Sequence, residues 1–162
     1  MKKILLLASI IIVSAGCVPF GGYTVDWAPV EITIQAFDAD GNSIISPEMP
    51  GMTLTYKGDI YTVQDPQNYQ IPTKDYLAIL YGLYARPVAD GVYCLTCGEI
   101  DGGVDMDEDI VLNWPDGSED VIHYHCSNHV EWPSPKCKRY WKLNGVKQDR
   151  SDFTFYNKSL PE

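Results

Sequence analysis

The segment IVLNWPDGSEDVIHYHC, residues 110–126, carries the clearest structural signal in the chain. Both of its ends are rich in β-branched and aromatic residues, which favour β-strands. The residues between them, PDGS at positions 115–118, are typical of a tight turn. The segment therefore predicts a β-hairpin, with strands over residues 110–114 and 120–126.

Alternate residues of a β-strand point to opposite faces of the sheet. In the second strand of this hairpin, the apolar Ile122 and Tyr124 share one face with Cys126, while His123 and His125 share the other. We expect the first face to pack in the core and the face with the two histidines to meet solvent.

The sequence on either side of this hairpin repeats the same kind of pattern. Short runs of strand-forming residues alternate with turn residues, and Asn144-Gly145 is a strong signal for a two-residue hairpin turn. The run YLAILYGLYAR at residues 76–86 fits a helix or a buried strand, and its three tyrosines and internal Gly82 favour the strand. About seven to nine short strands predict an all-β fold, an immunoglobulin-like or prealbumin-like β-sandwich.

Composition and charge limit the classes of partner. The chain has 162 residues, of which 45% are hydrophobic and 21% are charged, an ordinary balance for one globular domain. Its 22 acidic residues exceed its 12 basic residues, which gives a net charge of −10. Because such a surface repels phosphate backbones, we expect no nucleic-acid partner.

The N-terminus has the build of a secretory signal peptide. Met1-Lys2-Lys3 is a short positive start, and residues 4–15 are almost entirely apolar. These twelve residues would form about 18 Å of helix, whereas the hydrocarbon core of a bilayer is ~30 Å thick. The length therefore indicates a signal peptide rather than a membrane span.

The end of this leader, SAGC at residues 14–17, resembles the lipobox of bacterial lipoproteins, in which the cysteine is acylated and becomes the first mature residue. Ser14 departs from the leucine usual at its position. The resemblance implies cleavage after residue 16 and a membrane partner reached through acylated Cys17. Because the next residue, Val18, is not acidic, the same resemblance implies the outer membrane rather than the inner one.

These signals give the expected domain organisation. Residues 1–16 are the lipoprotein signal peptide, and residues 17–29, which are rich in glycine and proline, are a lipidated tether. Residues 30–162 then form a single β-sandwich domain.

Several turn-rich motifs spread over the mature chain form a recognisable set. They are DWAPV at 26–30, DADGN at 38–42, TYKG at 55–58, GEIDG at 98–102, NWPDGSED at 113–120 and WKLNG at 141–145. The set resembles small, uncharacterised envelope lipoproteins of Bacteroidetes. This resemblance implies an envelope location and a β-fold, and it implies no catalytic activity.

The three histidines lie within seven residues of one another, at His123, His125 and His129. Two imidazoles on one strand face are compatible with two ligands of a zinc ion. A symmetric hairpin would pair Asn113 with Asp120 and set Glu108 opposite His125 as a third ligand; His129 is the other candidate. The alternative is that the imidazoles are hydrogen-bonded to carboxylates on a solvated sheet face. The sequence favours this alternative, and we expect no cofactor.

Four cysteines besides Cys17 would lie in an oxidising compartment, where disulfides are the default expectation. Cys126 and Cys137 bracket a loop that contains two prolines and are the candidate disulfide. Cys94 and Cys97 would face opposite sides of a regular strand, too far apart to form a bridge. A thioredoxin-like role would also require a helix after Cys97, where a thiolate is stabilised, and none is expected.

The chain lacks a nucleophile elbow, a phosphate loop and a nucleotide-binding fingerprint. The sequence leaves open whether the chain is an enzyme and favours a lipid-anchored, non-catalytic binding or structural module of a Gram-negative envelope. Its expected partner is a glycan or another envelope protein. The alternatives are an envelope metalloprotein that uses His123 and His125, and a thiol oxidoreductase that uses Cys94 or Cys97.

Overall fold

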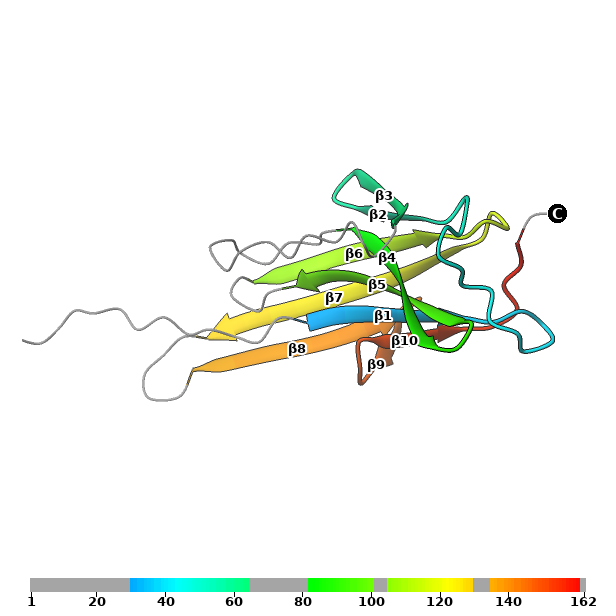
Figure 1. The fold of residues 1–162 in the computed structure, drawn as a ribbon. Coiled ribbons are helices and arrows are strands. Elements are labelled where there is room, and N and C mark those ends of the chain that lie inside the picture. The colour runs from blue at the N-terminus through cyan, green and yellow to red at the C-terminus, as the bar shows by residue number, and fades with distance from the viewer. Residues whose placement is uncertain (1–29, 65–81, 101–104, 130–134, 161–162) are drawn as a thin grey trace, which may run out of the picture.

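A computed structural model of the chain describes residues 30–64, 82–100, 105–129 and 135–160 (Figure 1). The predicted signal peptide, Cys17 and the tether lie outside these residues. The described residues form ten β-strands: β1 Val30–Ala36, β2 Thr53–Tyr56, β3 Asp59–Gln64, β4 Leu83–Ala89, β5 Val92–Ile100, β6 Met106–Asn113, β7 Glu119–His129, β8 Lys136–Leu143, β9 Val146–Gln148 and β10 Asp152–Phe155. The predicted all-β fold is confirmed, with more strands than expected.

A search of these ranges for a helix long and apolar enough to cross a bilayer finds none. Residues 83–86 of the ambiguous run 76–86 belong to β4, so the strand interpretation is correct for this part. The part up to residue 81 lies outside the described residues.

The ten strands form one continuous sheet rather than the two separate sheets of a sandwich. Their order is β10-β1-β5-β4-β3-β2-β6-β7-β8-β9. Two blocks meet at β3 and β4, which run parallel and pair only Val63 with Leu83 and Gln64 with Tyr84. Within the blocks neighbouring strands are antiparallel, except β10, which pairs parallel with β1. The sheet curls across this short contact (Figure 1). One curled sheet therefore encloses the core that the predicted sandwich would enclose between two sheets.

The curl brings the inner faces of both blocks into one hydrophobic core. The Trp141 ring on β8 meets the Phe153 ring on β10 edge-on, with centroids 6.0 Å apart, and Trp114 packs against Phe155 at 5.1 Å. The first contact joins β10, at one end of the sheet order, to β8, the second strand from the other end, and the second joins β10 to the loop between β6 and β7. Fully buried residues from both blocks fill the space between: Ile32, Ile34, Leu54, Leu83, Leu95, Ile110, Leu112, Ile122 and Tyr124.

The hairpin of β6 and β7 exists as predicted, but its register differs by one residue. Asn113 pairs with Glu119, and not with Asp120. The reason lies in the loop: the Trp114 amide donates to the Ser118 carbonyl at 2.9 Å, which leaves three loop residues, and Gly117 closes the loop with a φ of 82°. A three-residue loop that ends in a left-handed glycine is a common hairpin connection. The symmetric four-residue loop was therefore wrong.

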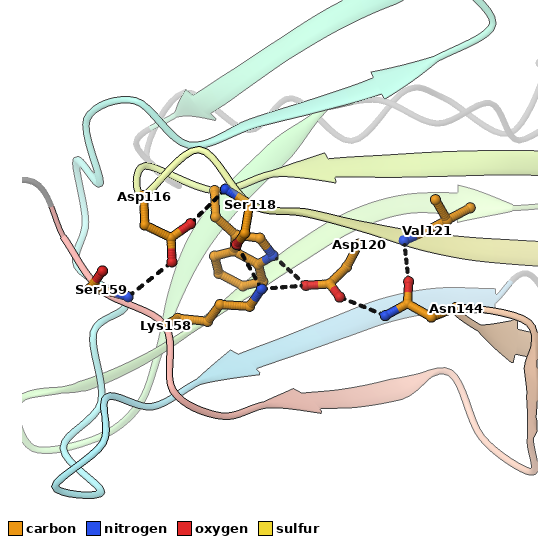
Figure 2. A network of polar contacts seen from close by, with 8 residues as sticks. Asp116, Ser118, Asp120, Val121, Asn144, Lys158 and Ser159 are labelled. Atoms are coloured by element: carbon orange, nitrogen blue, oxygen red, sulfur yellow. Dashed lines mark hydrogen bonds and ion pairs between the residues drawn. The ribbon is translucent and has the colours of Figure 1, made fainter.

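The C-terminal segment is fastened to this hairpin by a network of polar contacts (Figure 2). The Lys158 ammonium lies 2.7 Å from Asp120 Oδ2 and 2.9 Å from Ser118 Oγ. The Asp120 carboxylate also accepts hydrogen bonds from Trp114 Nε1 at 2.7 Å and from Asn144 Nδ2 at 2.6 Å. Because Asp120 is buried, these donors satisfy a charge that would otherwise be costly.

Candidate functional site

The outer face of β6, β7 and β8 carries the most regular polar array among the described residues. Its members, which we call the His–Asp face, are Asp107, Asp109, His123, His125, Tyr140 and Lys142. The register pairs Asp109 with His123 and Asp107 with His125 across β6 and β7. Across β7 and β8 it pairs His123 with Lys142 and His125 with Tyr140. Each row thus runs from a carboxylate through an imidazole to a lysine or a tyrosine.

Asp107 contacts both imidazoles of the His–Asp face. Its Oδ1 atom lies 3.1 Å from His125 Nδ1 and 3.2 Å from His123 Nε2. The other nitrogen of His123, Nδ1, lies 2.9 Å from Asp109 Oδ1. The exposed fractions of the two histidine side chains are 23% and 29%, so both rings keep one side toward solvent. This arrangement matches the alternative predicted from the sequence, in which the imidazoles are hydrogen-bonded to carboxylates on a solvated sheet face.

An aromatic ring completes the array. The Tyr140 ring stacks on the His125 ring with a centroid distance of 4.6 Å and an interplanar angle of 19°. The Lys142 ammonium lies 5.5 Å from the centroid of the same tyrosine, within the range of a cation–π contact. These contacts hold a flat amphipathic ring on the solvent side of the sheet.

The electrostatics of the face centre on Asp107. The hydrogen bond from His125 lowers the pKa of the Asp107 carboxyl below its ordinary value, and the charges of His123, His125 and Lys142 act in the same direction. Asp107 therefore stays ionised to a lower pH than a solvated aspartate, because its neighbours favour the charged form.

Glu108 and His129, which the sequence offered as the third metal ligand, lie outside the His–Asp face. The one-residue shift in register places Glu108 opposite Tyr124, and the Glu108 carboxylate forms an ion pair with Lys57 at 3.0 Å. His129 lies at the far end of β7, where it pairs with Lys136. Within the ranges that the structure covers, no three His, Cys, Asp or Glu side chains are grouped so that they could hold a metal ion.

The candidate disulfide partners lie in contact. Cys126 Sγ and Cys137 Sγ are 3.5 Å apart on the inner sides of β7 and β8, and no disulfide joins them. Burial raises the pKa of the Cys137 thiol, and its hydrogen bond with Cys126 acts in the same direction. The pairing of these two cysteines therefore stays a prediction that the geometry permits.

The cysteines of β5 lack the surroundings of a reactive thiol. Cys94 and Cys97 are both buried, and Cys97 belongs to the hydrophobic core. Burial raises the pKa of Cys97 far above that of a solvated thiol. A thiol oxidoreductase needs a lowered pKa at its attacking cysteine, so the environment of Cys97 opposes that function.

A cavity of about 490 Å³, which we call the distal pocket, lies where β7 ends and β8 begins. Five residues line it: Ser127, Asn128, His129, Lys136 and Lys138. The sequence analysis considered His129 only as a metal ligand and missed the lysines. A signal was available, because Lys/Arg residues are dense after residue 135 in an otherwise acidic chain.

The fold and these surfaces define a class: an all-β protein whose inner sheet face forms the core and whose outer face over β6, β7 and β8 is polar and aromatic. No family model matches the chain, and no curated protein or solved structure matches it either.

Proposed function

We propose that the chain is a lipid-anchored protein of a Gram-negative envelope, placed in the outer membrane, that acts as a non-catalytic binding module for an envelope glycan. The leader and the SAGC segment support the anchor at Cys17. The turn motifs that resemble small Bacteroidetes lipoproteins support the same location. The His–Asp face supports the binding role.

The observation that carries the binding role is the ordered ring of Tyr140 beside paired carboxylates and imidazoles. A sugar presents apolar C–H faces and a rim of hydroxyl groups. A half-buried tyrosine offers apolar surface to the former, and carboxylates and imidazoles offer acceptors and donors to the latter. Because these side chains already contact one another, ordering them on ligand binding would cost little side-chain conformational entropy.

The anchor is tested by mass spectrometry of the native protein and by membrane fractionation. We expect the mature chain to begin at Cys17 with an acyl mass attached, and a Cys17→Ser variant to lose that mass and leave the membrane fraction. A native protein that retains Met1 and has no acyl group would disprove the anchor and the envelope location together.

The binding role is tested with the mature protein on an array of bacterial envelope glycans. We expect Tyr140→Ala to lose binding that the matched control Tyr156→Ala keeps, since Tyr156 is an exposed tyrosine outside the His–Asp face. Equal binding by both variants, or no binding to any glycan of the array by the unchanged protein, would contradict the proposed role.

One observation favours a second candidate, the metalloprotein centred on His123 and His125. A single oxygen of Asp107 lies within 3.2 Å of a nitrogen from each imidazole, and imidazole and carboxylate are both ligands of zinc. This candidate ranks second because the part of the chain described here holds no complete ligand group. A zinc titration followed by thermal unfolding decides it: a true site raises the midpoint with zinc concentration, and His123→Ala with His125→Ala abolishes the rise.

A further inference from the structure

The strand order of the sheet begins at β10 and ends at β9, and β10 is bordered by a described strand, β1, on one side only. Backbone amides of β1 and of the residue after it donate to the carbonyls of Ser151 and Phe155 at 3.0 Å. Because the backbone groups of successive strand residues point to opposite sides, the amides and carbonyls of Asp152 and Thr154 point away from β1. No other described residue forms a hydrogen bond with these groups. The outer edge of β10 can therefore still pair with a further strand.

The two outermost strands differ in their side chains. At the opposite end of the sheet order, Lys147 lies on β9 and Lys142 lies on the neighbouring β8. Lysine or proline on an edge strand hinders its pairing with another chain. β10 has the sequence DFTF at residues 152–155, which contains neither residue and is rich in strand-forming residues. The β10 edge therefore lacks the side chains that oppose pairing.

The side chains of β10 alternate between the core and solvent. Phe153 and Phe155 are buried, whereas Asp152 and Thr154 are exposed. The two residues that turn their backbone groups to the free edge thus also present their side chains on the outer face of the sheet. One of these side chains is a carboxylate, which only accepts hydrogen bonds, and the other is a hydroxyl, which donates. The pair is complementary to a second copy of itself.

We propose that the β10 edge pairs antiparallel with the β10 edge of a second copy of this chain, about a two-fold axis at Phe153. In this register Asp152 of each copy lies opposite Thr154 of the other. Each such pair exchanges both backbone hydrogen bonds, and the threonine hydroxyl donates to the carboxylate beside it. The two carboxylates do not lie opposite each other, so the single charge on the strand does not oppose the pairing.

The symmetry of this contact limits the size of the assembly. Both copies use the same edge, so the pairing closes at two copies and does not continue into a fibre. β10 has only four residues, and we therefore expect a weak dimer, with a Kd of about 10–100 μM at physiological salt. This inference goes beyond the proposed function and depends neither on the acyl anchor nor on the His–Asp face.

Sedimentation equilibrium of the mature full-length protein in a neutral, density-matched detergent measures the association. We expect Thr154→Glu to weaken dimerisation about tenfold or more, because two carboxylates then lie opposite each other in both pairs. Thr154→Lys should strengthen dimerisation, because an ammonium group then lies opposite Asp152. The matched control is Thr62→Glu, at an exposed threonine on β3 inside the sheet order, and it should leave dimerisation unchanged.

Two outcomes of this measurement would overturn the proposal. One is an unchanged protein that stays monomeric at about 0.1 mM, above the expected Kd. The other is a Thr154→Lys variant that dimerises as poorly as Thr154→Glu, because the proposed register sets opposite signs for the two changes.

Disulfide trapping tests the same register independently of affinity. Opposite residues of the proposed pairs would have Cα atoms about 5.5 Å apart, within the range of a disulfide (about 4.4–6.8 Å). A mixture of the Asp152→Cys and Thr154→Cys proteins should therefore form a covalent dimer on mild oxidation. Asp152→Cys alone should not, because its two copies lie diagonally, about 7–8 Å apart. Equal cross-linking of the mixture and the single variant, or no cross-linking of the mixture, would exclude this pairing.

Discussion

Asp107 shows how one side chain can organise a surface. Its Oδ1 atom contacts an imidazole on each of two successive outward positions of β7, and the second imidazole stacks on Tyr140. The order of the His–Asp face therefore depends on a carboxylate that the sequence did not place beside the histidines. Sequence reasoning placed the two histidines on one face correctly, but the shift in register exchanged Glu108 for Asp107 as the neighbour of His125.

The lowered pKa of Asp107 predicts a pH-dependent contribution to stability. A carboxyl whose pKa is lower in the folded state stabilises the fold above its unfolded pKa, about 3.9, and this stabilisation is lost as the pH falls through the folded value. We therefore expect Asp107→Asn to reduce the free energy of unfolding at pH 7, and the difference from the unchanged protein to shrink below about pH 4. Urea unfolding of both proteins at a series of pH values measures this difference in the free energy of unfolding.

The control is Asp149→Asn, at an exposed carboxylate outside the His–Asp face. It should leave the pH profile of stability unchanged. A difference for Asp107→Asn that stays constant, or grows, as the pH falls would contradict the expected sign.

At the scale of elements, the β7–β8 pair carries both the His–Asp face and the distal pocket. Its outer side holds His125 stacked on Tyr140, and its far end forms the distal pocket. Its inner side holds Cys126 and Cys137, eleven positions apart in the chain with their sulfur atoms in contact.

We predict that Cys126 and Cys137 form a disulfide in the oxidised protein. Closing a loop of this size should raise the free energy of unfolding by about 2–3 kcal/mol. Urea unfolding with and without reductant measures the change, and a mass decrease of about 2 Da marks the bond, since two hydrogens leave. In Cys137→Ser, whose altered position is only partly buried, the response to reductant should vanish. A response that persists in this variant would assign the effect to other cysteines.

At the scale of the whole molecule, the curl of the sheet has to be held closed because the strand pairing between the two blocks is only the short contact of β3 and β4. Ring contacts between β8 and β10 close it through the core. Lys158 closes it at the end where the β6–β7 loop lies, because its ammonium reaches Asp120 (Figure 2). The same ammonium lies 5.0 Å from the centroid of the Trp114 ring. The side chains of Lys158 and Asp120 are only 12% and 11% exposed, so this ion pair is largely shielded from water.

We predict that Lys158→Met destabilises the protein by about 3 kcal/mol, because it leaves the buried Asp120 carboxylate without its cation. The free energy of unfolding in urea, followed by tryptophan fluorescence, measures the loss. Lys147→Met, at an exposed lysine on β9, should change stability by less than about 0.5 kcal/mol. If the two variants unfold alike, the ion pair does not hold the C-terminal segment closed.

The sequence by itself determined the all-β class and the faces of the central hairpin, since strand propensity and two-residue alternation are local properties. It placed Ile122 and Tyr124 in the core and the two histidines outside, as the structure does. The register of that hairpin became visible only in the folded structure, where a backbone hydrogen bond between Trp114 and Ser118 sets the loop length.

The tertiary structure also decided the order of the strands and the closure of the curled sheet. These depend on contacts such as Trp141 with Phe153 and Val63 with Leu83. Each of these contacts joins segments that are not adjacent in the sequence. The distal pocket follows the same rule, because its lysines and Ser127 meet only after β7 and β8 have paired. Local alternation tells which way a side chain points, whereas long-range pairing decides what it meets there.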